Sequence, residues 1–335
     1  MMNITFLGAG SWGTALAIML AKEGNDVTLW SAVESEVEML STYREHKNRL
    51  PGVILPDNIV VTSDEELALK NPDLVVFSVA SPFVRSTAKR VSKLIKDDQI
   101  IVNVAKGIED ETLLFLCDII EEEIPNARVA VLSGPSHAEE VSIGMPTTVV
   151  VGAKTQEIAE YIQDIFMNER FRVYTSPDII GIELGGAVKN VIALAAGTID
   201  GLGFQDNTKA ALITRGISEI SRLGIAMGGK METFLGLSGI GDLIVTCTSN
   251  HSRNHNAGYL IGKGMKADDA LKEINQVVEG VNTAKAALKL SQKYDVDMPI
   301  VESINAVLFD GVSAEKCLDL LLTRGKKEEY DSLSW

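Results

Sequence analysis

The sequence predicts an α/β protein in which a mainly parallel sheet is followed by an all-α domain. Short apolar runs typical of buried strands recur up to residue 151, and helical segments separate several of them. A glycine-rich turn lies between the first of these runs and the first helix. From about residue 177 strand patterns become scarce and helical patterns follow one another. We therefore expect a dinucleotide-binding domain over 1–178, a helical domain over 179–325 and a frayed end over 326–335.

The first unit of the chain has the pattern G-x-G-x-x-G, with Gly8, Gly10 and Gly13. It lies between a strand over Asn3–Leu7 and a helix over Ala15–Lys22, and a second strand over Asp26–Trp30 closes the unit. In this context the first glycine permits a tight turn, the second lets the backbone approach a pyrophosphate, and the third lets the helix pack closely on the sheet. The pattern predicts a Rossmann-like, doubly wound fold that binds a dinucleotide. The alternative is a glycine turn that binds nothing.

The end of the second strand leaves the choice of dinucleotide open. An acidic residue there is typical of NAD sites and an arginine is typical of NADP sites. This chain has Trp30-Ser-Ala-Val-Glu34, with neither residue in the expected place. Glu34 is either a late substitute for the acid or an ordinary carboxylate in the first turn of a helix.

Strand and helix patterns alternate through the rest of the first half. Further strands are expected at Ile59–Thr62, Leu74–Val79, Ile100–Val104, Val129–Leu132 and Thr147–Val151, with helices at Phe83–Lys96 and Glu111–Glu123. Ligands bind beyond the carboxyl ends of parallel strands. The loops of interest are therefore Ser78–Pro82, Val104–Gly107 and Ser133–His137.

Two of these loops carry groups that suit an anion or a carbonyl oxygen. Lys106 follows a strand and precedes a glycine, although a surface lysine in a turn fits the same pattern. Ser133–Ser136 leads into a helix whose first amides and hydroxyls can receive an anion. His137 is interpreted as a polar residue of that first turn.

The second half is predicted to be helical, with its site in a cleft against the first domain. The expected helices are Ile179–Ile199, Lys209–Leu223, Met231–Leu235, Ala267–Val277, Thr283–Lys293, Ile300–Leu308 and Ala314–Thr323. One intervening segment, Leu237–His255, is predicted to be non-helical because of its glycines and polar residues. In it, Asp242 can approach another group closely, and Ser252–Asn254 suits a phosphate because arginine can donate to two oxygens. A solvated polar loop is the alternative.

A single lysine, Lys189, lies in the apolar, glycine-bearing run Glu183–Ile192. Burial in such a run disfavours the ammonium form and prepares the group to exchange protons. The same pattern also fits an amphipathic helix whose lysine stem packs while its head reaches water.

The charge of the chain limits its partners. The 335 residues carry a formal net charge of −15, which argues against nucleic acid or an anionic membrane surface, since both require a basic face. The N-terminus shows neither the basic region nor the cleavage pattern of a signal peptide. Ile179–Ile199 is interrupted by two charged residues, so it predicts a helix buried in protein and no membrane insertion. We expect a cytoplasmic protein.

No metal site or serine triad is expected. Cys117, Cys247 and Cys317 are odd in number and widely spaced, which fits neither a disulfide framework nor metal ligation. His251 and His255 are four residues apart but lack the carboxylate of an H-E-x-x-H pattern. No G-x-S-x-G turn supports a nucleophilic serine.

Seven ordered blocks give the chain a resemblance to a known family. They are Gly8–Ala15, Ala105–Gly107, Ser133–Ser136, Gly185–Asn190, Gly239–Leu243, Ser252–Asn254 and Gln276–Gly280. Together they resemble the bacterial NAD(P)-dependent sn-glycerol-3-phosphate dehydrogenases, from residue 3 to about residue 323. The resemblance implies an oxidoreductase that interconverts dihydroxyacetone phosphate and sn-glycerol 3-phosphate for glycerophospholipid synthesis, with NAD or NADP as cofactor. A homodimer is usual for the family.

The resemblance also implies roles for individual residues. Lys189 is the proton donor and acceptor, with Lys106 and Asp242 beside it. The substrate contacts are Lys106, Gly134, Ser136, Lys189, Asp242, Ser252, Arg253 and Asn254. The dinucleotide contacts are Gly8, Gly10, Ser11, Trp12, Gly13, Lys106, Ala138, Arg253, Val277 and Glu279.

Elementary chemistry agrees with these roles. Hydride transfer to a ketone requires an acid at the carbonyl oxygen, and the substrate phosphate requires cations. Apolar surroundings and Lys106 lower the pKa of Lys189 while Asp242 raises it, and the sequence leaves the balance open. The chain departs from the family in lacking a basic pair after Trp30 and in having His255 where an arginine is frequent. Two alternatives are a related two-domain hydroxy-acid dehydrogenase and a non-catalytic dinucleotide-sensing regulator.

Overall fold

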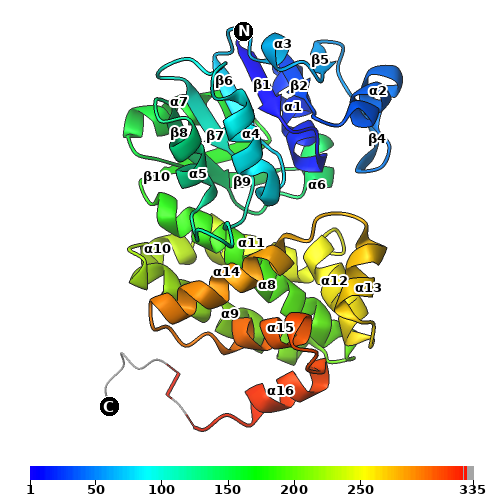
Figure 1. The fold of residues 1–335 in the computed structure, drawn as a ribbon, viewed down its shortest axis with the longest axis vertical. Helices are drawn as coiled ribbons and strands as arrows, with labels where there is room; N and C mark the ends of the chain where they lie inside the picture. The colour runs from blue at the N-terminus through cyan, green and yellow to red at the C-terminus, as the bar shows by residue number, and fades with distance from the viewer. Residues whose placement is uncertain (327, 330–335) are drawn as a thin grey trace.

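The computed structural model describes residues 1–326, 328 and 329, and it confirms the predicted fold class (Figure 1). The N-terminal half contains an eight-stranded sheet with the strand order β10-β9-β8-β7-β6-β1-β2-β5. Neighbouring strands are parallel except β8 and β9, which are antiparallel. Most of the end expected to fray, over 326–335, lies outside the described residues.

The strands of the main sheet are short and apolar. They are β1 (Asn3–Leu7), β2 (Asp26–Trp30), β5 (Ile59–Thr62), β6 (Leu74–Phe77), β7 (Ile100–Asn103), β8 (Arg128–Ser133), β9 (Thr147–Ala153) and β10 (Phe171–Ser176). A separate antiparallel pair is formed by β3 (Glu45–His46) and β4 (Leu50–Ile54). β10 was not among the strands predicted from the sequence, and its alternating burial is typical of an edge strand.

Helices cover both faces of the sheet, as continuous apolar strands require. One core joins the sheet to α1 (Ser11–Lys22), α2 (Glu34–Tyr43), α6 (Ala138–Ser142) and α7 (Gln156–Phe166). The core of the other face joins it to α3 (Glu65–Ala68), α4 (Val84–Val91) and α5 (Leu116–Glu123). Two of these helices are shorter than predicted. The helix expected over Phe83–Lys96 ends at Val91, and the helix expected over Glu111–Glu123 begins only at Leu116.

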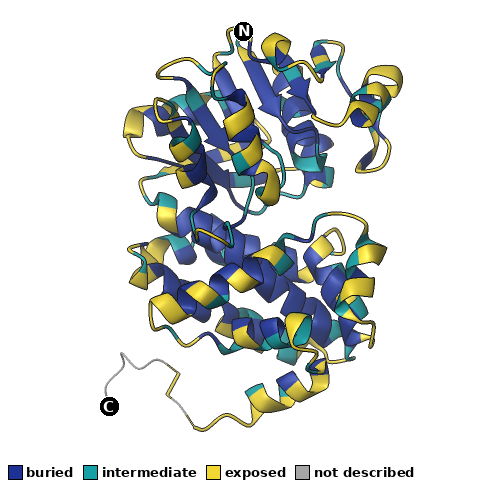
Figure 2. Cartoon of the chain, viewed as in Figure 1, coloured by how far each residue is buried: buried dark blue, intermediate teal, exposed yellow. Residues whose placement is uncertain are grey.

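The second domain surrounds one central helix, α8 (Ile179–Gly201), which is almost entirely buried (Figure 2). The other helices are α9 (Asp206–Ala226), α10 (Met231–Phe234), α11 (Asp242–Thr248), α12 (Arg253–Gly262), α13 (Ala267–Ile274), α14 (Glu279–Lys293), α15 (Pro299–Phe309) and α16 (Ala314–Leu322). Of the described helices, α8 alone is long and apolar enough to cross a membrane, but 89% of its most apolar window is buried inside the protein.

The prediction of a non-helical segment over Leu237–His255 was wrong except at 249–252, which lie between α11 and α12. A π-helical turn over Leu237–Gly241 is followed by α11 and by the start of α12. β-branched residues lower the helix propensity of α11, but its buried Leu243 and Cys247 pack in the same core as α8, and packing overrides propensity. Ser252 caps α12 by accepting a hydrogen bond from the His255 amide at 3.2 Å.

Glycines let α8 and α12 approach closely. A Cβ on Gly197 would overlap the carbonyl oxygen of His255, and a Cβ on Gly258 would overlap that of Leu194. The first residues of α12 are therefore held against the middle of α8.

Candidate active site

The carboxyl ends of the parallel strands face the helical domain, and a cavity of about 560 Å³ lies between them. Its lining includes the turn after β1, the loops after β6 and β7, and residues of α8, α11 and α12. The cleft is thus where the sequence analysis expected it. Residues from both domains must meet for the site to form.

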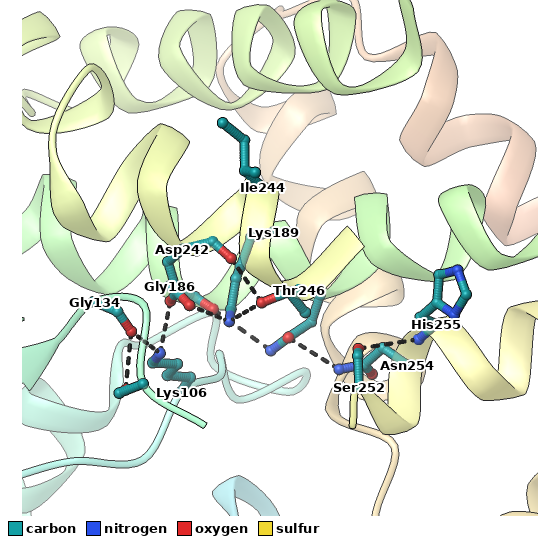
Figure 3. A network of polar contacts seen from close by, with 12 residues as sticks. Lys106, Gly134, Gly186, Lys189, Asp242, Ile244, Thr246, Ser252, Asn254 and His255 are labelled. Carbon is teal, nitrogen blue, oxygen red and sulfur yellow. Dashed lines mark hydrogen bonds and ion pairs between the residues drawn. The ribbon is translucent and has the colours of Figure 1, made fainter. Parts of the chain in front are cut away.

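A single carboxylate, that of Asp242, holds two lysines (Figure 3). Lys189 Nζ lies 2.5 Å from Asp242 Oδ1, and Lys106 Nζ lies 2.6 Å from Asp242 Oδ2. Lys189 comes from the middle of α8, Lys106 from the loop after β7, and Asp242 from the first position of α11. Three segments far apart in the sequence therefore build one charged cluster.

Thr246 is a member of this cluster that the sequence analysis missed. Lys189 Nζ donates to Thr246 Oγ1 at 2.6 Å, and that hydroxyl donates to the Asp242 carbonyl at 2.6 Å. The residue lies one turn after Asp242, so the i, i+4 spacing would have indicated it had the segment been interpreted as a helix.

Lys189 is buried, with 7% of its side chain exposed, at the wall of the cavity. Burial lowers its pKa, Asp242 raises it and Lys106 lowers it, and the result is a pKa of about 8. Burial therefore decides the balance that the sequence left open. A lysine in this state can give and take a proton near neutral pH.

The loop after β8 provides a second partner for Lys106. Lys106 Nζ donates to the Gly134 carbonyl at 3.1 Å, and Ser136 Oγ donates to the same oxygen at 3.0 Å. Gly134 has φ +143°, a backbone conformation that residues with a side chain rarely adopt. A Cβ there would lie 3.0 Å from Val149 Cα. The turn thus brings a carbonyl and a hydroxyl to the lysine.

The start of α12 lies beside the same cavity, which Ser252, Arg253 and Asn254 all line. Asn254 Nδ2 donates to Asn190 Oδ1 on α8 at 3.0 Å, and its Oδ1 accepts from the Gly280 amide at 2.8 Å. These bonds fix the orientation of Asn254 between α8 and α14. Arg253 is the first residue of α12 and lines the cavity, and anions are favoured at a helix N-terminus.

The turn after β1 has the shape that a dinucleotide pyrophosphate requires. Gly8 has φ +119°, and a Cβ there would lie 2.5 Å from the Val79 amide nitrogen. A Cβ on Gly13 would overlap Ser78 Oγ, whose hydroxyl donates to the Gly8 carbonyl at 2.8 Å. The N-terminus of α1 therefore opens onto the cavity, and the residues fit the cofactor that the glycine pattern implies.

Most of the remaining predicted cofactor contacts also line the cavity, namely Gly10, Ser11, Trp12, Val277 and Glu279. Two predicted cofactor contacts do not line it, Gly13 and Ala138, and neither do two predicted substrate contacts, Gly134 and Asp242. Glu279 accepts hydrogen bonds from the amide and hydroxyl of Ser81, the amide at 3.0 Å. This contact joins the start of α14 to the loop after β6 across the cleft.

Two histidines lie next to each other at the cavity, and a third, His255, pairs with a carboxylate elsewhere. His137 lines the cavity, and its ring centroid lies 5.7 Å from that of His251. Burial and the charge of Lys189 lower the pKa of His137. His255 Nε2 lies 2.8 Å from Asp200 Oδ2, next to Lys209. Within the part of the chain that is described, no three His, Cys, Asp or Glu side chains are grouped as a metal site.

Comparisons with known proteins identify the family. A model described as the NAD-dependent glycerol-3-phosphate dehydrogenase N-terminus matches residues 3–159, and the model of the C-terminus of the same enzyme matches residues 178–319. The chain belongs to the NAD-dependent glycerol-3-phosphate dehydrogenase family. This result confirms the resemblance drawn from the seven sequence blocks.

Full-length relatives agree with this assignment. A protein of Agathobacter rectalis named glycerol-3-phosphate dehydrogenase [NAD(P)+] is 59% identical, with 100% of both chains covered. One of the same name from Fusobacterium nucleatum is 56% identical over 99% of this chain and 100% of its own. The crystal structure of glycerol-3-phosphate dehydrogenase from Coxiella burnetii matches with a TM-score of 0.94 and 35% identity, covering 96% of this chain and 99% of that one.

We expect Thr246→Val to lower the pKa of Lys189 below about 8. The substitution removes a hydrogen-bond acceptor that stabilises the ammonium form. The pKa can be measured as the midpoint of Lys189 acetylation against pH, followed by mass spectrometry. Thr248→Val is the control, because the Thr248 hydroxyl bonds to the Ile244 carbonyl at 2.9 Å on an exposed part of the same helix. Equal midpoints in the Thr246 variant and the wild type would contradict this role.

Proposed function

We propose that this chain is an NAD(P)-dependent sn-glycerol-3-phosphate dehydrogenase that interconverts dihydroxyacetone phosphate and sn-glycerol 3-phosphate. The observation that carries the proposal is the buried Lys189 held by Asp242 in a cavity that also exposes a glycine turn suited to a dinucleotide. A ketone reductase needs these two elements side by side. Membership of the family supports this reaction over the two alternatives.

Lys189 is assigned as the proton donor and acceptor. The reduced nicotinamide supplies a hydride to the ketone carbon when it is bound. Lys189, as the ammonium, gives a proton to the carbonyl oxygen, and the resulting amine regains a proton from solvent. In the oxidative direction the neutral amine takes the hydroxyl proton, and the pKa of about 8 makes both forms accessible near neutral pH.

Lys106 and Asp242 support this proton transfer. Asp242 orients both ammonium groups through bonds of 2.5 and 2.6 Å. Lys106 contributes a second positive charge that stabilises negative charge on the reacting oxygen and lowers the pKa of Lys189.

The start of α12 is assigned to the substrate phosphate. Arg253 can donate to two phosphate oxygens, and the amides at the helix N-terminus add partial positive charge. Ser252 and Asn254 line the same side of the cavity. On the other side, in the first domain, Gly134 and Ser136 lie beside Lys106. A carboxylate substrate would need fewer donors, which favours a phosphate over a hydroxy-acid.

The remaining assignments concern the cofactor and the domains. Residues 1–178 form the dinucleotide-binding domain, with contacts from Gly8, Gly10, Ser11, Trp12, Gly13, Lys106 and Ala138. The helical domain adds contacts from Arg253, Val277 and Glu279. Residues 179–325 supply the substrate site. We further propose a cytoplasmic homodimer that feeds glycerophospholipid synthesis.

The purified protein is expected to oxidise NADH or NADPH when given dihydroxyacetone phosphate, and to do so much more slowly with unphosphorylated dihydroxyacetone. The phosphate supplies binding energy through Arg253 that the smaller ketone lacks. Initial rates followed at the absorbance of the reduced nicotinamide, with each substrate and each cofactor, test this. Equal kcat/KM values for the two ketones would refute the phosphate assignment.

Lys189→Ala is expected to lower kcat by about a hundredfold to ten-thousandfold, the range of a general acid. Dinucleotide affinity, measured by calorimetry, should stay within about twofold because the variant leaves the glycine turn intact. Lys209→Ala is the control, since Lys209 pairs with Asp200 at 2.7 Å outside the cavity. Retention of full turnover by the Lys189 variant would place the acid elsewhere.

A further inference from the structure

A buried carboxylate, that of Glu36, lies at the end of the cavity beyond β2. It comes from the first turn of α2, and 10% of its side chain is exposed. Ser31, the residue directly after β2, donates its hydroxyl to Glu36 Oε2 at 2.5 Å. Both residues line the cavity, so the hydroxyl of Ser31 holds the carboxylate of the helix close to the end of the strand.

This position is where dinucleotide-binding sheets distinguish their cofactors. An acidic residue about twenty positions after the glycine turn binds the adenosine ribose hydroxyls in NAD sites. In the sequence, Glu34 is one candidate for this role. Glu34 is exposed and does not line the cavity, so it is an ordinary first-turn carboxylate of α2. Glu36, two residues later, is the acid that reaches the site.

The arginines at this end of the cavity already face carboxylates. Arg49 Nη1 lies 3.3 Å from Glu36 Oε1 and 3.6 Å from where a Cβ on Gly10 would be. Arg90 lies over the Trp30 ring, 5.4 Å from its centroid, and forms an ion pair with Glu65. A 2′-phosphate entering here would meet two arginines whose charges are already offset by the carboxylates of Glu36 and Glu65.

The carboxylate of Glu36 is held in its ionised form. Burial raises the pKa of Glu36. Hydrogen bonds from His46 and Ser31 and the charge of Arg49 together lower it by more, so the pKa lies below its ordinary value. His46 Nε2 lies 3.2 Å from Glu36 Oε1 and is itself buried. The negative charge is therefore built into the fold and does not depend on solvent.

We propose that Glu36 sets the dinucleotide preference of this chain and that the preference is for NAD(H) over NADP(H). Its carboxylate accepts hydrogen bonds from ribose hydroxyls and repels a 2′-phosphate. Specific sites often combine an attractive element with a repulsive one, and one ionised group supplies both here. The inference deepens the proposed dehydrogenase function by assigning its nucleotide.

Calorimetric titration of the purified protein with NADH and with NADPH, without substrate, tests the inference. The wild type should bind NADH at least about tenfold more tightly than NADPH. Glu36→Gln keeps an acceptor oxygen and removes the charge, so it should tighten NADPH binding and bring the two dissociation constants within about threefold. Glu34→Gln, on the exposed side of the same helix, should keep the wild-type ratio.

Two results would overturn the inference: a wild type that binds NADPH as tightly as NADH, or an unchanged ratio in Glu36→Gln. Arg49→Ala leaves the carboxylate in place and should keep the preference for NADH at least as large, which provides a second variant if Glu36→Gln does not fold. A loss of the NADH preference in Arg49→Ala would also contradict the role of Glu36. Binding is measured without the ketone, so failure of the proposed reaction would be seen separately.

Discussion

The site depends on the burial of one ammonium group, that of Lys189, in the middle of an apolar helix. An unpaired charge in such surroundings is costly, and the pairing with Asp242 at 2.5 Å makes its burial possible. Because Asp242 also holds Lys106 at 2.6 Å, the carboxylate fixes the first domain against the second at the reacting centre. The proton-transfer group and the domain arrangement therefore share one interaction.

The close contact of α8 with α12 serves the same site. Glycines on both helices allow their backbones to touch, which places the first turn of α12 beside Lys189. Asn254 then bonds to Asn190 on α8 and to the amide of Gly280 on α14. Small residues thus position the groups assigned to the substrate phosphate, and any side chain at Gly197 or Gly258 would move them.

The sequence predicted the parts of the fold that depend on local patterns. The strands Asn3–Leu7, Asp26–Trp30 and Ile59–Thr62 have the expected bounds, because apolar runs between turns are strong local signals. The helix over Asp242–Thr248 was missed because the glycines and polar residues around it indicated a loop. Its β-branched residues have weak helix propensity, and its packing in the core of α8 makes it helical.

Contacts between distant segments were harder to predict. The sequence indicated Lys189, Lys106 and Asp242 as site residues. They were grouped into one site by the resemblance to a family, because no spacing rule connects them. Thr246 was missed with its helix. Glu36 was overlooked in favour of Glu34, because which of two carboxylates on a helix turns inward depends on Ser31 and His46, and these contacts are tertiary.

The pH dependence of kcat/KM for dihydroxyacetone phosphate reduction in wild type and Asp242→Asn tests the central claim most directly. The wild-type rate should fall above a pKa of about 8, as the Lys189 ammonium loses its proton. Asp242 raises that pKa, so removing its charge should move the fall to lower pH by about one unit or more. A fall at the same or a higher pH in Asp242→Asn would contradict the account.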